Sequence, residues 1–487
     1  MKPTIHCFVP FADEAQVKAT IEALKQSDLV TKITLLATEA TEAPVLGCDV
    51  IVTEGLNASS TMKKIAEAAT ADYILLYTKY NKLVPGYFAL ERFARLAEDS
   101  QAGMLYSDSY TVIDGKKSNA PVIDYQFGSL RDDFNFGSVL FFNAVAFKKA
   151  AAGIDKSYKA AGLYDLRLRL SRIAAIVHIN EYLYTDVTLD NRRSGEKIFD
   201  YVDPKNRGVQ LEMEEACTAH LREIGGYLEP VFTAIDFNRG EFEYEASVII
   251  PVRNRVRTIR DAIRSVLSQK ADFAFNLIII DNHSTDGTTE AIDEFAADPR
   301  LIHIIPERDD LGIGGCWNMG VEHPKCGKFA VQLDSDDVYA GEDTLAKVVS
   351  AFYEQNCSMV VGTYMLSDLD LNMLPPGVID HKEWTPDNGR NNALRINGLG
   401  APRAFYTPML REIHVPNTSY GEDYALGLAF SRQYQIGRIY DVLYYCRRWE
   451  DNSDAALDVV KMNNNNLYKD RIRTWELQAR IALNKAK

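Results

Sequence analysis

Short apolar runs alternate with amphipathic stretches along the first part of the chain. The runs of strand length cover residues 5–9, 32–37, 50–53 and 72–77. Between them, residues 13–26 and 59–69 place apolar side chains three and four positions apart, the spacing of a helix with one buried face. Strands that alternate with helices predict a mostly parallel sheet covered on both faces, so we expect an α/β fold.

The alternation begins again at residue 246 and repeats features of the first part. Strand-like runs cover residues 246–251, 276–280, 301–305 and 329–333, and helix-like stretches cover 258–269 and 288–295. The segment DYILLY at 72–77 aligns with KFAVQL at 328–333, and LYDLRLRLSR from Leu163 aligns with DYALGLAFSR from Asp423. Internal similarity of this kind predicts two similar Rossmann-like domains in tandem.

Polar segments mark the expected domain boundaries. Residues 190–208 are rich in Arg, Asp, Asn and Gly, and residues 211–228 begin as an amphipathic helix. We expect a first domain at 1–190, a linker with a helix at 191–245, a second domain at 246–457 and a C-terminal helix at 458–487. Residues 461–487 carry seven Lys or Arg against two Asp or Glu, so this basic helix either packs on its own domain or contacts a membrane surface.

Composition limits the location and the partners. The 487-residue chain is 46% hydrophobic and 25% charged, which is usual for soluble globular proteins. A net charge of −14 excludes a general affinity for nucleic acid. Seven scattered cysteines without a CxxC pair indicate reduced thiols, and no apolar run approaches the roughly 20 residues that span a bilayer. We expect a cytoplasmic protein without a signal peptide, whose membrane contact is at most peripheral to the inner face.

An acidic run follows the strand expected at 329–333. It contains Asp334, Asp336 and Asp337 within four residues. Carboxylates this close repel one another unless a cation neutralises them, and hard oxygen ligands suit Mg²⁺ or Mn²⁺ held partly by substrate phosphates. Ligands of open α/β sheets bind at the carboxyl ends of strands, where these acids would lie. The alternative is a surface turn, in which Asp and Ser are common.

Four motifs in order over about 200 residues resemble family 2 glycosyltransferases of the GT-A fold. They are IPVRN, Asp281 with STDG, the DSDD segment, and GED at 421–423. The resemblance implies a hexosyltransferase-type enzyme that moves a sugar, with inversion, from a UDP- or GDP-sugar to a carbohydrate or lipid-linked acceptor, as in bacterial surface polysaccharide assembly. The faint repeat extends the GT-A-like fold to the first domain. The donor base stays open, because Asn282 stands where the family usually has a second acid.

The resemblance also implies roles for individual residues. The metal ligands would be Asp336, Asp334 and Asp337. The nucleotide would contact Pro251, Arg253, Asn254, Asp281, Asn282, Gly312, Asp334, Ser335 and Arg447. The base that takes the acceptor proton would be Asp423 rather than its neighbour Glu422, because adjacent helical residues point about 100° apart and only one can face the acceptor.

Structural roles compete with several of these assignments. Asp281 could close an Asx turn, and Arg253 could be an ordinary exposed arginine. Gly312 belongs to a segment with four glycines, 311–320, which either approaches the ligand or packs a helix closely. In the long segment 375–406, Trp384 is a candidate for stacking on a sugar, and His381, Glu383, Asn391 and Arg395 are candidates for binding hydroxyls.

The first copy of the repeat lacks the acidic residues. Thr78, Lys79, Tyr80 and Asn81 stand where the second copy has DSDD, and Gly162 with Leu163 stand where it has Glu422 with Asp423. We therefore predict that the first domain is not catalytic and serves acceptor binding, dimerisation or support. The oligomeric state, including a homo-oligomer, stays open.

Two other functions compete with glycosyl transfer. One is a binding scaffold for sugar nucleotides or glycans in which both domains are inactive. The other is a sugar nucleotidylyltransferase, which also uses an α/β sheet and metal-binding acids. The latter needs a glycine-rich, basic loop after its first strand, and IPVRNRVRTIR contains arginine but no glycine.

Overall fold

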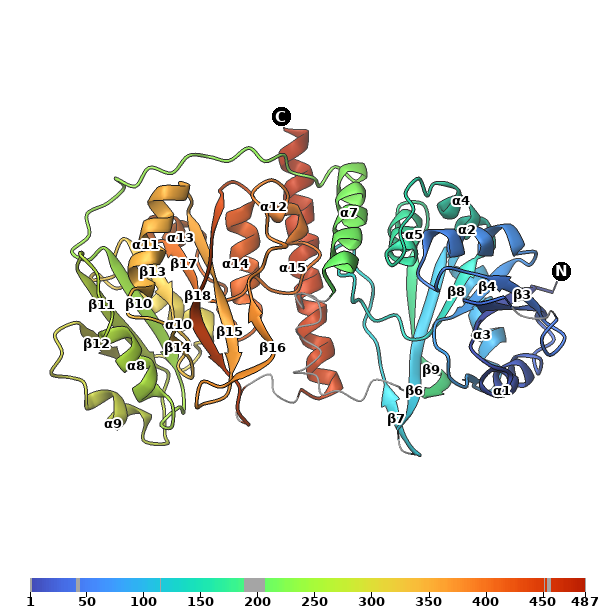
Figure 1. Cartoon of the computed structure of the whole chain (residues 1–487), viewed down its shortest axis with the longest axis horizontal. Helices are drawn as coiled ribbons and strands as arrows, with labels where there is room; N and C mark the ends of the chain where they lie inside the picture. The colour runs from blue at the N-terminus through green and yellow to red at the C-terminus, as the bar shows by residue number, and fades with distance from the viewer. Residues whose placement is uncertain are drawn as a thin grey trace. The chain divides into compact units, whose positions relative to one another are not determined.

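The computed structural model describes residues 2–40, 44–113, 115–187, 206–450, 452 and 457–486. These residues divide into two compact units, each with its own β-sheet (Figure 1). The described residues of the first unit are those up to 187 together with 206–227 and 457–486, and those of the second unit are 228–450 and 452.

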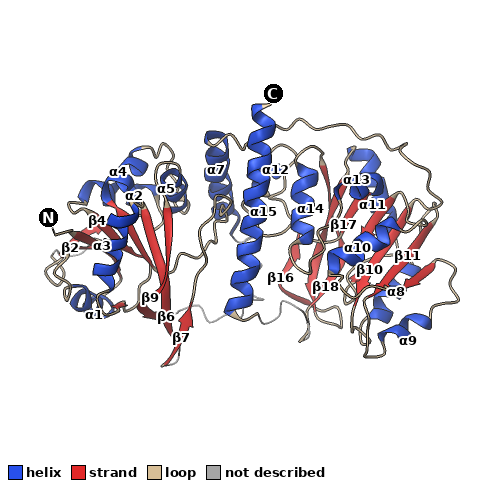
Figure 2. Cartoon of the chain, turned by 180° about the vertical axis from the view of Figure 1, so that it is seen from behind, coloured by secondary structure: helices blue, strands red, loops and turns tan. Residues whose placement is uncertain are grey.

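The first unit combines one β-sheet with helices that alternate with its strands along much of the chain (Figure 2). Its elements are β1 (Ile5–Phe11), α1 (Glu14–Leu24), β2 (Val30–Ala37), β3 (Asp49–Val52), α2 (Ser59–Ala68), β4 (Tyr73–Tyr77), β5 (Val84–Pro85), α3 (Ala89–Ser100), β6 (Met104–Ile113), β7 (Lys116–Ala120), β8 (Val139–Asn143), α4 (Ala144–Ala152), α5 (Gly162–Ser171), β9 (Ile176–Val187) and α7 (Arg207–Glu223), with α15 (Val459–Lys485) from the end of the chain. The strand order is β3-β2-β1-β4-β8-β6-β9-β5, and β7 pairs with β6.

The second unit repeats this plan. Its elements are β10 (Ala246–Val252), α8 (Ile259–Leu267), β11 (Phe275–Asp281), α9 (Thr288–Asp293), β12 (Leu301–Ile304), α10 (Ile313–Glu322), β13 (Phe329–Gln332), β14 (Val338–Tyr339), α11 (Thr344–Gln355), β15 (Met359–Ser367), β16 (Met373–Ile379), α12 (Gly389–Asn392), β17 (Arg403–Tyr406), α13 (Thr407–Ile413), α14 (Glu422–Ser431) and β18 (Ile436–Arg447). The strand order is β12-β11-β10-β13-β17-β15-β18-β14, and β16 pairs with β15.

Each strand of one sheet has a counterpart at the same place in the other. The central strands β1 and β10 both lie parallel to their neighbours, and β4 and β13 both meet an antiparallel strand, β8 and β17. The aligned elements also keep the spacing seen in the sequence: α5 and α14 begin at residues 162 and 422, and β9 and β18 begin at 176 and 436. The structure thus confirms two tandem α/β domains of the GT-A-like class.

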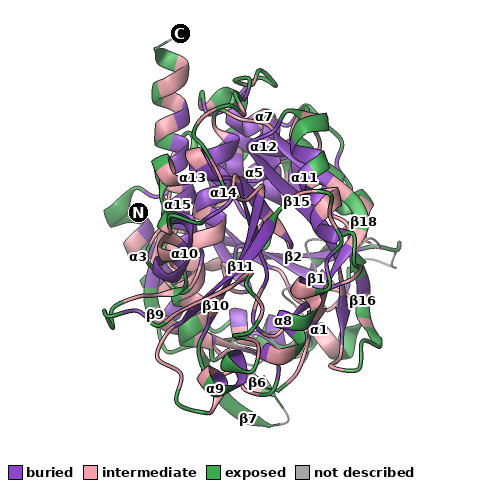
Figure 3. Cartoon of the chain, turned by 90° about the vertical axis from the view of Figure 1, so that its left-hand side faces the viewer, coloured by how far each residue is buried: buried purple, intermediate pink, exposed green. Residues whose placement is uncertain are grey.

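Helices cover both faces of the first sheet because its central strands are apolar on both sides. Cys7 and Val9 of β1 pack in one core with α1 and α3, while Phe8 packs in another with α2, α4 and α5. Successive strand residues point to opposite faces, so a strand buried on both reads as a continuous apolar run. In the second unit, β11 is buried along its whole length (Figure 3).

The segment expected to link the domains divides between the two units. Helix α7 belongs to the first unit, and residues 228–245 belong to the second. Glu212 of α7 accepts hydrogen bonds from the backbone N–H groups of Ala160 and Ala161, immediately before α5. The rest of the expected linker, residues 191–205, lies outside the described residues.

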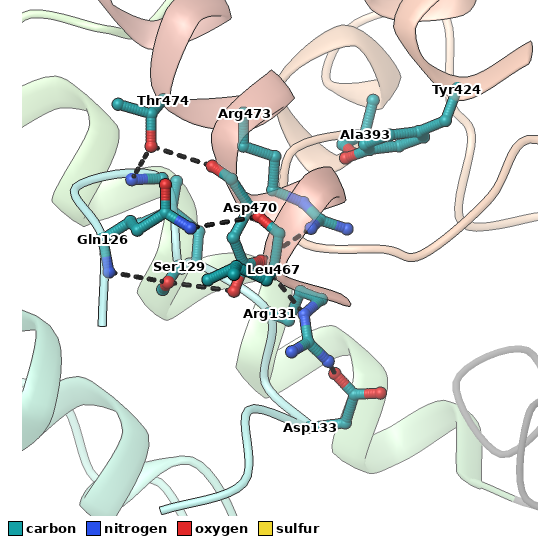
Figure 4. Close-up of polar contacts among 12 residues, drawn as sticks. Gln126, Ser129, Arg131, Asp133, Ala393, Tyr424, Leu467, Asp470, Arg473 and Thr474 are labelled. Carbon is teal, nitrogen blue, oxygen red and sulfur yellow. Dashed lines mark hydrogen bonds and ion pairs between the residues drawn. The ribbon is translucent and has the colours of Figure 1, made fainter. Parts of the chain in front are cut away.

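The C-terminal helix α15 is held to the first unit by a buried polar network rather than by an apolar stripe. Asp470 is fully buried, and its carboxylate accepts hydrogen bonds from Ser129 Oγ (2.9 Å), Arg131 Nε (3.1 Å) and the Arg473 guanidinium (2.8 Å) (Figure 4). Gly128 lets its loop touch the helix backbone, since a Cβ there would collide with Thr474 N. Trp475 is 58% exposed. No helix among the described residues is both long enough and apolar enough to span a bilayer.

The Asp470 network predicts how firmly α15 is held. Asp470→Asn removes the negative charge between two buried arginines. We expect this to lower the free energy that holds α15 in place by on the order of 3 kcal/mol. We expect the amides of α15 and of residues 126–131 to exchange with deuterium about 100-fold faster, because each 1.4 kcal/mol corresponds to a factor of ten. Hydrogen-exchange mass spectrometry of the full chain measures this. The control Asp99→Asn removes the carboxylate of an exposed ion pair with Arg95 and should leave exchange unchanged; unchanged exchange in Asp470→Asn would contradict the prediction.

Candidate active site

A polar cleft of about 290 Å³ opens in the second unit where β10 and β13 end. Its charged lining comes from five segments: the loop after β10, the acidic run after β13, the start of β17, the first turn of α14 and the residue after β18. The lining residues with polar side chains are Arg255, Gln332, Asp334, Ser335, Asp336, Asp337, Arg403, Glu422, Asp423, Arg448 and Asn452. The sheet topology therefore brings the DSDD and GED motifs into one site.

Within the described part of the chain, the carboxylate of Asp336 is held only by long contacts. Its Oδ2 accepts weak hydrogen bonds from Trp449 Nε1 (3.3 Å) and Asn452 Nδ2 (3.2 Å), and Arg255 Nε lies 3.6 Å away. Its side chain keeps 15% of its surface exposed. These long hydrogen bonds from neutral donors are weak, so the carboxylate could give them up to bind a cation.

Asp334 and Asp337 are held more tightly. Asp334 Oδ1 accepts from Gln332 Nε2 (2.9 Å), and Asp337 Oδ1 accepts from the backbone N–H of Arg447 (2.7 Å). Burial raises the pKa of Asp334, and burial together with the charges of Asp336 and Asp334 raises the pKa of Asp337 well above its usual range. The three acids thus repel one another, as expected for a site whose charge is to be balanced by a cation.

Arg403, at the start of β17, is the principal residue that the sequence reasoning missed. Its Nη1 lies 2.8 Å from Asp423 Oδ2 and donates to the carbonyl of Gly400 (2.6 Å). Burial disfavours its charge, but Asp423, Asp334 and Glu422 hold the pKa of Arg403 above its ordinary value. The available signal was an arginine opening the apolar strand RAFY, because arginine is rarely buried unless it is paired.

The two acids of the first turn of α14 have different environments. Asp423 is paired with Arg403 and keeps 26% of its side chain exposed. Glu422 Oε2 is buried without a hydrogen-bond partner, and burial, reinforced by the charge of Asp423, raises the pKa of Glu422 to about 8. An ionised carboxylate that reaches the cleft can accept a proton at neutral pH, whereas a protonated one cannot.

The residues expected to contact the nucleotide base have structural partners. Asp281 is fully buried, and its oxygens accept from Ser284 N (3.0 Å) and Thr289 Oγ1 (2.5 Å). Burial opposes its ionisation, but hydrogen bonds from His303, Ser284 and Thr289 hold the pKa of Asp281 well below its usual value. The structure thus places Asp281 in the turn that we weighed as the alternative, and Asp281 is not among the residues that line the cleft.

The neighbours of Asp281 are closer to the surface. Asn254 has a positive φ of 56° and accepts from Thr285 N (2.8 Å), which ties the IPVRN loop to the STDG turn. Asn282 donates to the carbonyl of Leu311 (2.9 Å), while its own carbonyl oxygen is buried without a partner. Arg253 is exposed, and Pro251 lines the cleft.

The glycine-rich segment packs a helix rather than lining the cleft with backbone. A Cβ on Gly312 would lie 2.7 Å from the carbonyl carbon of Thr418, and one on Gly314 would collide with Pro416 O. A Cβ on Gly320 would lie 2.9 Å from the side chain of Ile249 in β10. These glycines let α10 approach both the sheet and residues 415–418. Of the two roles considered for this segment, the structure shows close helix packing.

Two further expectations need correction. Arg447 is 3% exposed, and its guanidinium binds the carbonyl of Asp336 (2.5 Å) and Asp261 (3.0 Å), so it braces the acidic run from behind. Arg448 is the arginine that lines the cleft. The candidate sugar-binding residues of segment 375–406 do not face solvent, because each is at most 4% exposed: His381, Glu383, Trp384, Asn391 and Arg395. They form part of the interior of the second unit.

A metal ion would need ligands from outside the protein. Within the described ranges, no three His, Cys, Asp or Glu side chains converge closely enough to hold a metal by themselves. The oxygen donors of Asp336 and Asp334 nevertheless suit Mg²⁺ or Mn²⁺, which bind through one or two carboxylates completed by phosphate and water. The residues present therefore fit a cation that arrives with a diphosphate.

An ion pair occupies the corresponding strand end of the first unit. Lys79 Nζ, in the TKYN segment, lies 2.9 Å from Asp186 Oδ2, and Ser138 Oγ also donates to this carboxylate. Asp186 is 2% exposed on its side chain. In the first unit, the positive charge at this strand end is therefore the Lys79 ammonium group. The TKYN segment contains no acid that a metal cation would have to neutralise.

Ionisation of Glu422 should make stability depend on pH. With a folded pKa of about 8 and an unfolded one of 4.5, the folded state holds a proton that the unfolded state has released between these values. The free energy of unfolding therefore falls as the pH rises from about 4.5 to about 8. Glu422→Gln removes this loss, so we expect the variant to be more stable than wild type at pH 8, by at least about 1.4 kcal/mol, and nearly equal at pH 5.

Calorimetry at both pH values measures the difference. Glu354→Gln, on an exposed position of α11, is the matched control and should show the same small difference at pH 5 and pH 8. Equal stability of Glu422→Gln and wild type at pH 8 would count against a buried, protonated Glu422.

Comparison with known proteins shows what the second unit is similar to. Residues 247–409 match the family described as glycosyl transferase family 2. TuaG of Bacillus subtilis, named for teichuronic acid biosynthesis, is 28% identical over 148 residues, which are 30% of this chain and 58% of TuaG. The Escherichia coli enzyme WfgD, a UDP-Glc:α-D-GlcNAc-diphosphoundecaprenol β-1,3-glucosyltransferase, is 25% identical over 48% of this chain and 85% of its own length.

Solved structures add little to this assignment. Staphylococcus aureus TarS 1–349 in complex with UDP-GlcNAc aligns with 48% of this chain and 72% of its own length, at 21% identity and a TM-score of 0.38. The sequence match itself spans β10 to α13 and contains the DSDD segment and Arg403. The match to glycosyl transferase family 2 therefore lies entirely within the second unit of this chain.

Proposed function

We propose that the second unit catalyses metal-dependent, inverting transfer of a sugar from a nucleotide-sugar donor to a carbohydrate or lipid-linked acceptor. The observation that carries the proposal is the meeting of Asp334, Asp336, Arg403 and Asp423 in one cleft. Such a reaction needs charge stabilisation at the departing diphosphate and a base for the acceptor hydroxyl. The cleft holds candidates for both.

The acidic run accounts for the donor side. A divalent cation bound with the donor would offset the negative charge that develops on the leaving phosphate. Asp336, with its weakly held carboxylate, and Asp334 beside it are the proposed ligands. Asp337 binds the backbone of Arg447, so we assign it to positioning the run rather than to the metal. Arg448 lines the same cleft and is placed to meet a phosphate.

Asp423 accounts for the acceptor side. It lies in the first turn of α14, where the helix dipole favours a negative charge, and its ion pair with Arg403 fixes its orientation. Taking the acceptor proton from the face opposite the leaving group is what inversion of the anomeric centre requires. Arg403 touches Asp423 rather than a reacting atom, so it acts as a positioning residue.

The relatives support a role in surface polysaccharide assembly. TuaG is named for teichuronic acid biosynthesis, and WfgD is named for glucosyl transfer from UDP-Glc to a diphosphoundecaprenol-linked sugar. By analogy we propose a UDP- or GDP-sugar as donor and Mn²⁺ or Mg²⁺ as the cation. All seven cysteines lie in the described part of the chain and none of them forms a disulfide, which supports a cytoplasmic site of action.

Asp336→Asn tests the metal site. Wild type should be stabilised by UDP or GDP with Mn²⁺ and much less with EDTA, by about 2.7 kcal/mol at 100 times the dissociation constant. The variant should lose the metal-dependent part, because a neutral amide binds Mn²⁺ poorly. Thermal shift with UDP, GDP, CMP and their sugars measures this, and Asp343→Asn, an exposed acid of the same unit, is the matched control. Failure of every nucleotide to stabilise the wild type would refute the enzyme proposal.

Asp423→Asn tests the base. We expect kcat to fall by a factor of about 10² to 10⁴ while the donor still binds, because the loss falls on proton transfer. Glu422→Gln should lose less than about tenfold, since Glu422 is already protonated near neutral pH. Steady-state kinetics with an active donor measures both variants, and proton NMR of the first product formed shows whether the anomeric configuration inverts. Equal losses in the two variants, or a retained configuration, would count against Asp423 as the base.

A further inference from the structure

The first unit contains a larger cleft than the second, about 500 Å³. It lacks counterparts of the acids Asp334, Asp336 and Asp337. Its lining includes Thr78 after β4, Leu140 and Phe142 of β8, and Leu163 at the start of α5. The volume lies within the range of about 300–1,000 Å³ that is usual for small-molecule sites. The catalytic residues are lost, but a cavity remains.

This cleft occupies the place that the active-site cleft occupies in the repeat. Phe142 pairs with Ile74, and Phe405 pairs with Ala330, which is the counterpart of Ile74. Leu140 therefore corresponds to Arg403, two residues before Phe405. Thr78 corresponds to Asp334, and Leu163 corresponds to Asp423. Three charged residues of the second cleft thus have uncharged counterparts in the first.

Aromatic residues form one wall of the first cleft. Phe136 is partly exposed, and its ring lies 4.4 Å from that of Phe134 and 5.0 Å from that of Tyr106, centre to centre. The guanidinium of Arg167 lies 5.4 Å from the Phe136 ring and donates both to Ser129 O and to Arg131 O. These contacts hold the ring of Phe136 in place at the cleft, so that little reordering is needed to receive a flat apolar ligand face.

Short polar side chains form the rim. Asn57, Asp133 and Asn135 line the cleft and are exposed, and Asp132 lies beside them. Asp133 receives Arg131 on one oxygen and keeps 53% of its side chain exposed. The short side chains of Asp and Asn can form hydrogen bonds with adjacent hydroxyl groups of a ligand. The negative charges of the two acids would repel a nucleotide or phosphate ligand. The one arginine of the lining, Arg167, donates its hydrogen bonds to backbone carbonyls.

We propose that this cleft binds a neutral pyranose unit of a glycan, with its C–H face on Phe136 and its hydroxyls on the acidic and amide rim. An uncharged sugar has both features that the lining offers: a flat apolar face and hydroxyl groups around its edge. The inference concerns a site other than the proposed catalytic cleft and requires no transfer reaction there. It gives the first domain a binding function in place of the lost chemistry.

Saturation-transfer difference NMR on the full chain tests the proposal. The probes are the methyl glycosides of glucose, galactose and N-acetylglucosamine and the disaccharides built from them. We expect at least one to bind, with Phe136→Ala weakening it by at least about tenfold through loss of the buried ring surface. Phe136→Tyr keeps the ring and should retain binding. Phe127→Ala removes a phenylalanine of the same unit that is 44% exposed and outside the lining, so it should have no effect.

Two more variants separate this site from the catalytic cleft and from misfolding. Asp336→Asn should leave sugar binding unchanged, whereas it is expected to abolish metal-dependent nucleotide binding. Asn57→Ala removes one rim amide without touching the aromatic cluster, and should weaken binding at least about threefold even if Phe136→Ala unfolds. Binding of no pyranoside, binding unaffected by the cleft variants, or displacement of the sugar by octanol or by UDP in EDTA would overturn the proposal.

Discussion

The guanidinium of Arg403, whose side chain is only 14% exposed, makes the contact on which the polar cleft of the second unit depends. It stands between Asp423, which lies at 2.8 Å, and Asp334, both of which raise its pKa. Five carboxylates line this cleft, and an unpaired buried charge is among the costliest features a fold can contain. One arginine on a central strand therefore places a positive charge among the acids that follow β13 and open α14, so that they can share one cavity.

The first unit shows what happens when the charged residues of the cleft are replaced together. Where Asp334, Arg403 and Asp423 are replaced by Thr78, Leu140 and Leu163, no buried cation is needed at the centre of the cleft. The positive charge moves to Lys79, which pairs with the buried Asp186. The same sheet topology thus supports a cleft with three charged residues at these positions in one copy and a cleft with an aromatic wall and a polar rim in the other.

Much of this organisation follows from local patterns. The apolar runs give the strands, the three- and four-residue spacing gives the helices, and the offsets of 256 and 260 residues between aligned segments reappear in the paired elements β4 with β13 and α5 with α14. The DSDD run lies at the end of β13, on the edge of the sheet where α/β folds bind ligands, and the start of α14 brings the GED motif to the same cleft. What failed was the orientation of single side chains. Arg447 and Arg448 are adjacent, and only contacts with Asp261 and the Asp336 carbonyl turn the first one inward.

The sequence by itself determined the fold class, the repeat, the loss of acids from the first copy and the acidic run that organises the second, since each depends on residue type and spacing along the chain. The tertiary structure decided which acid is paired and which is protonated, that Trp384 and its polar neighbours are interior, and that α15 is anchored through Asp470. It also decided that a cavity remains in the first unit. These features depend on burial and on charges brought together from distant segments, and neither is encoded in local periodicity.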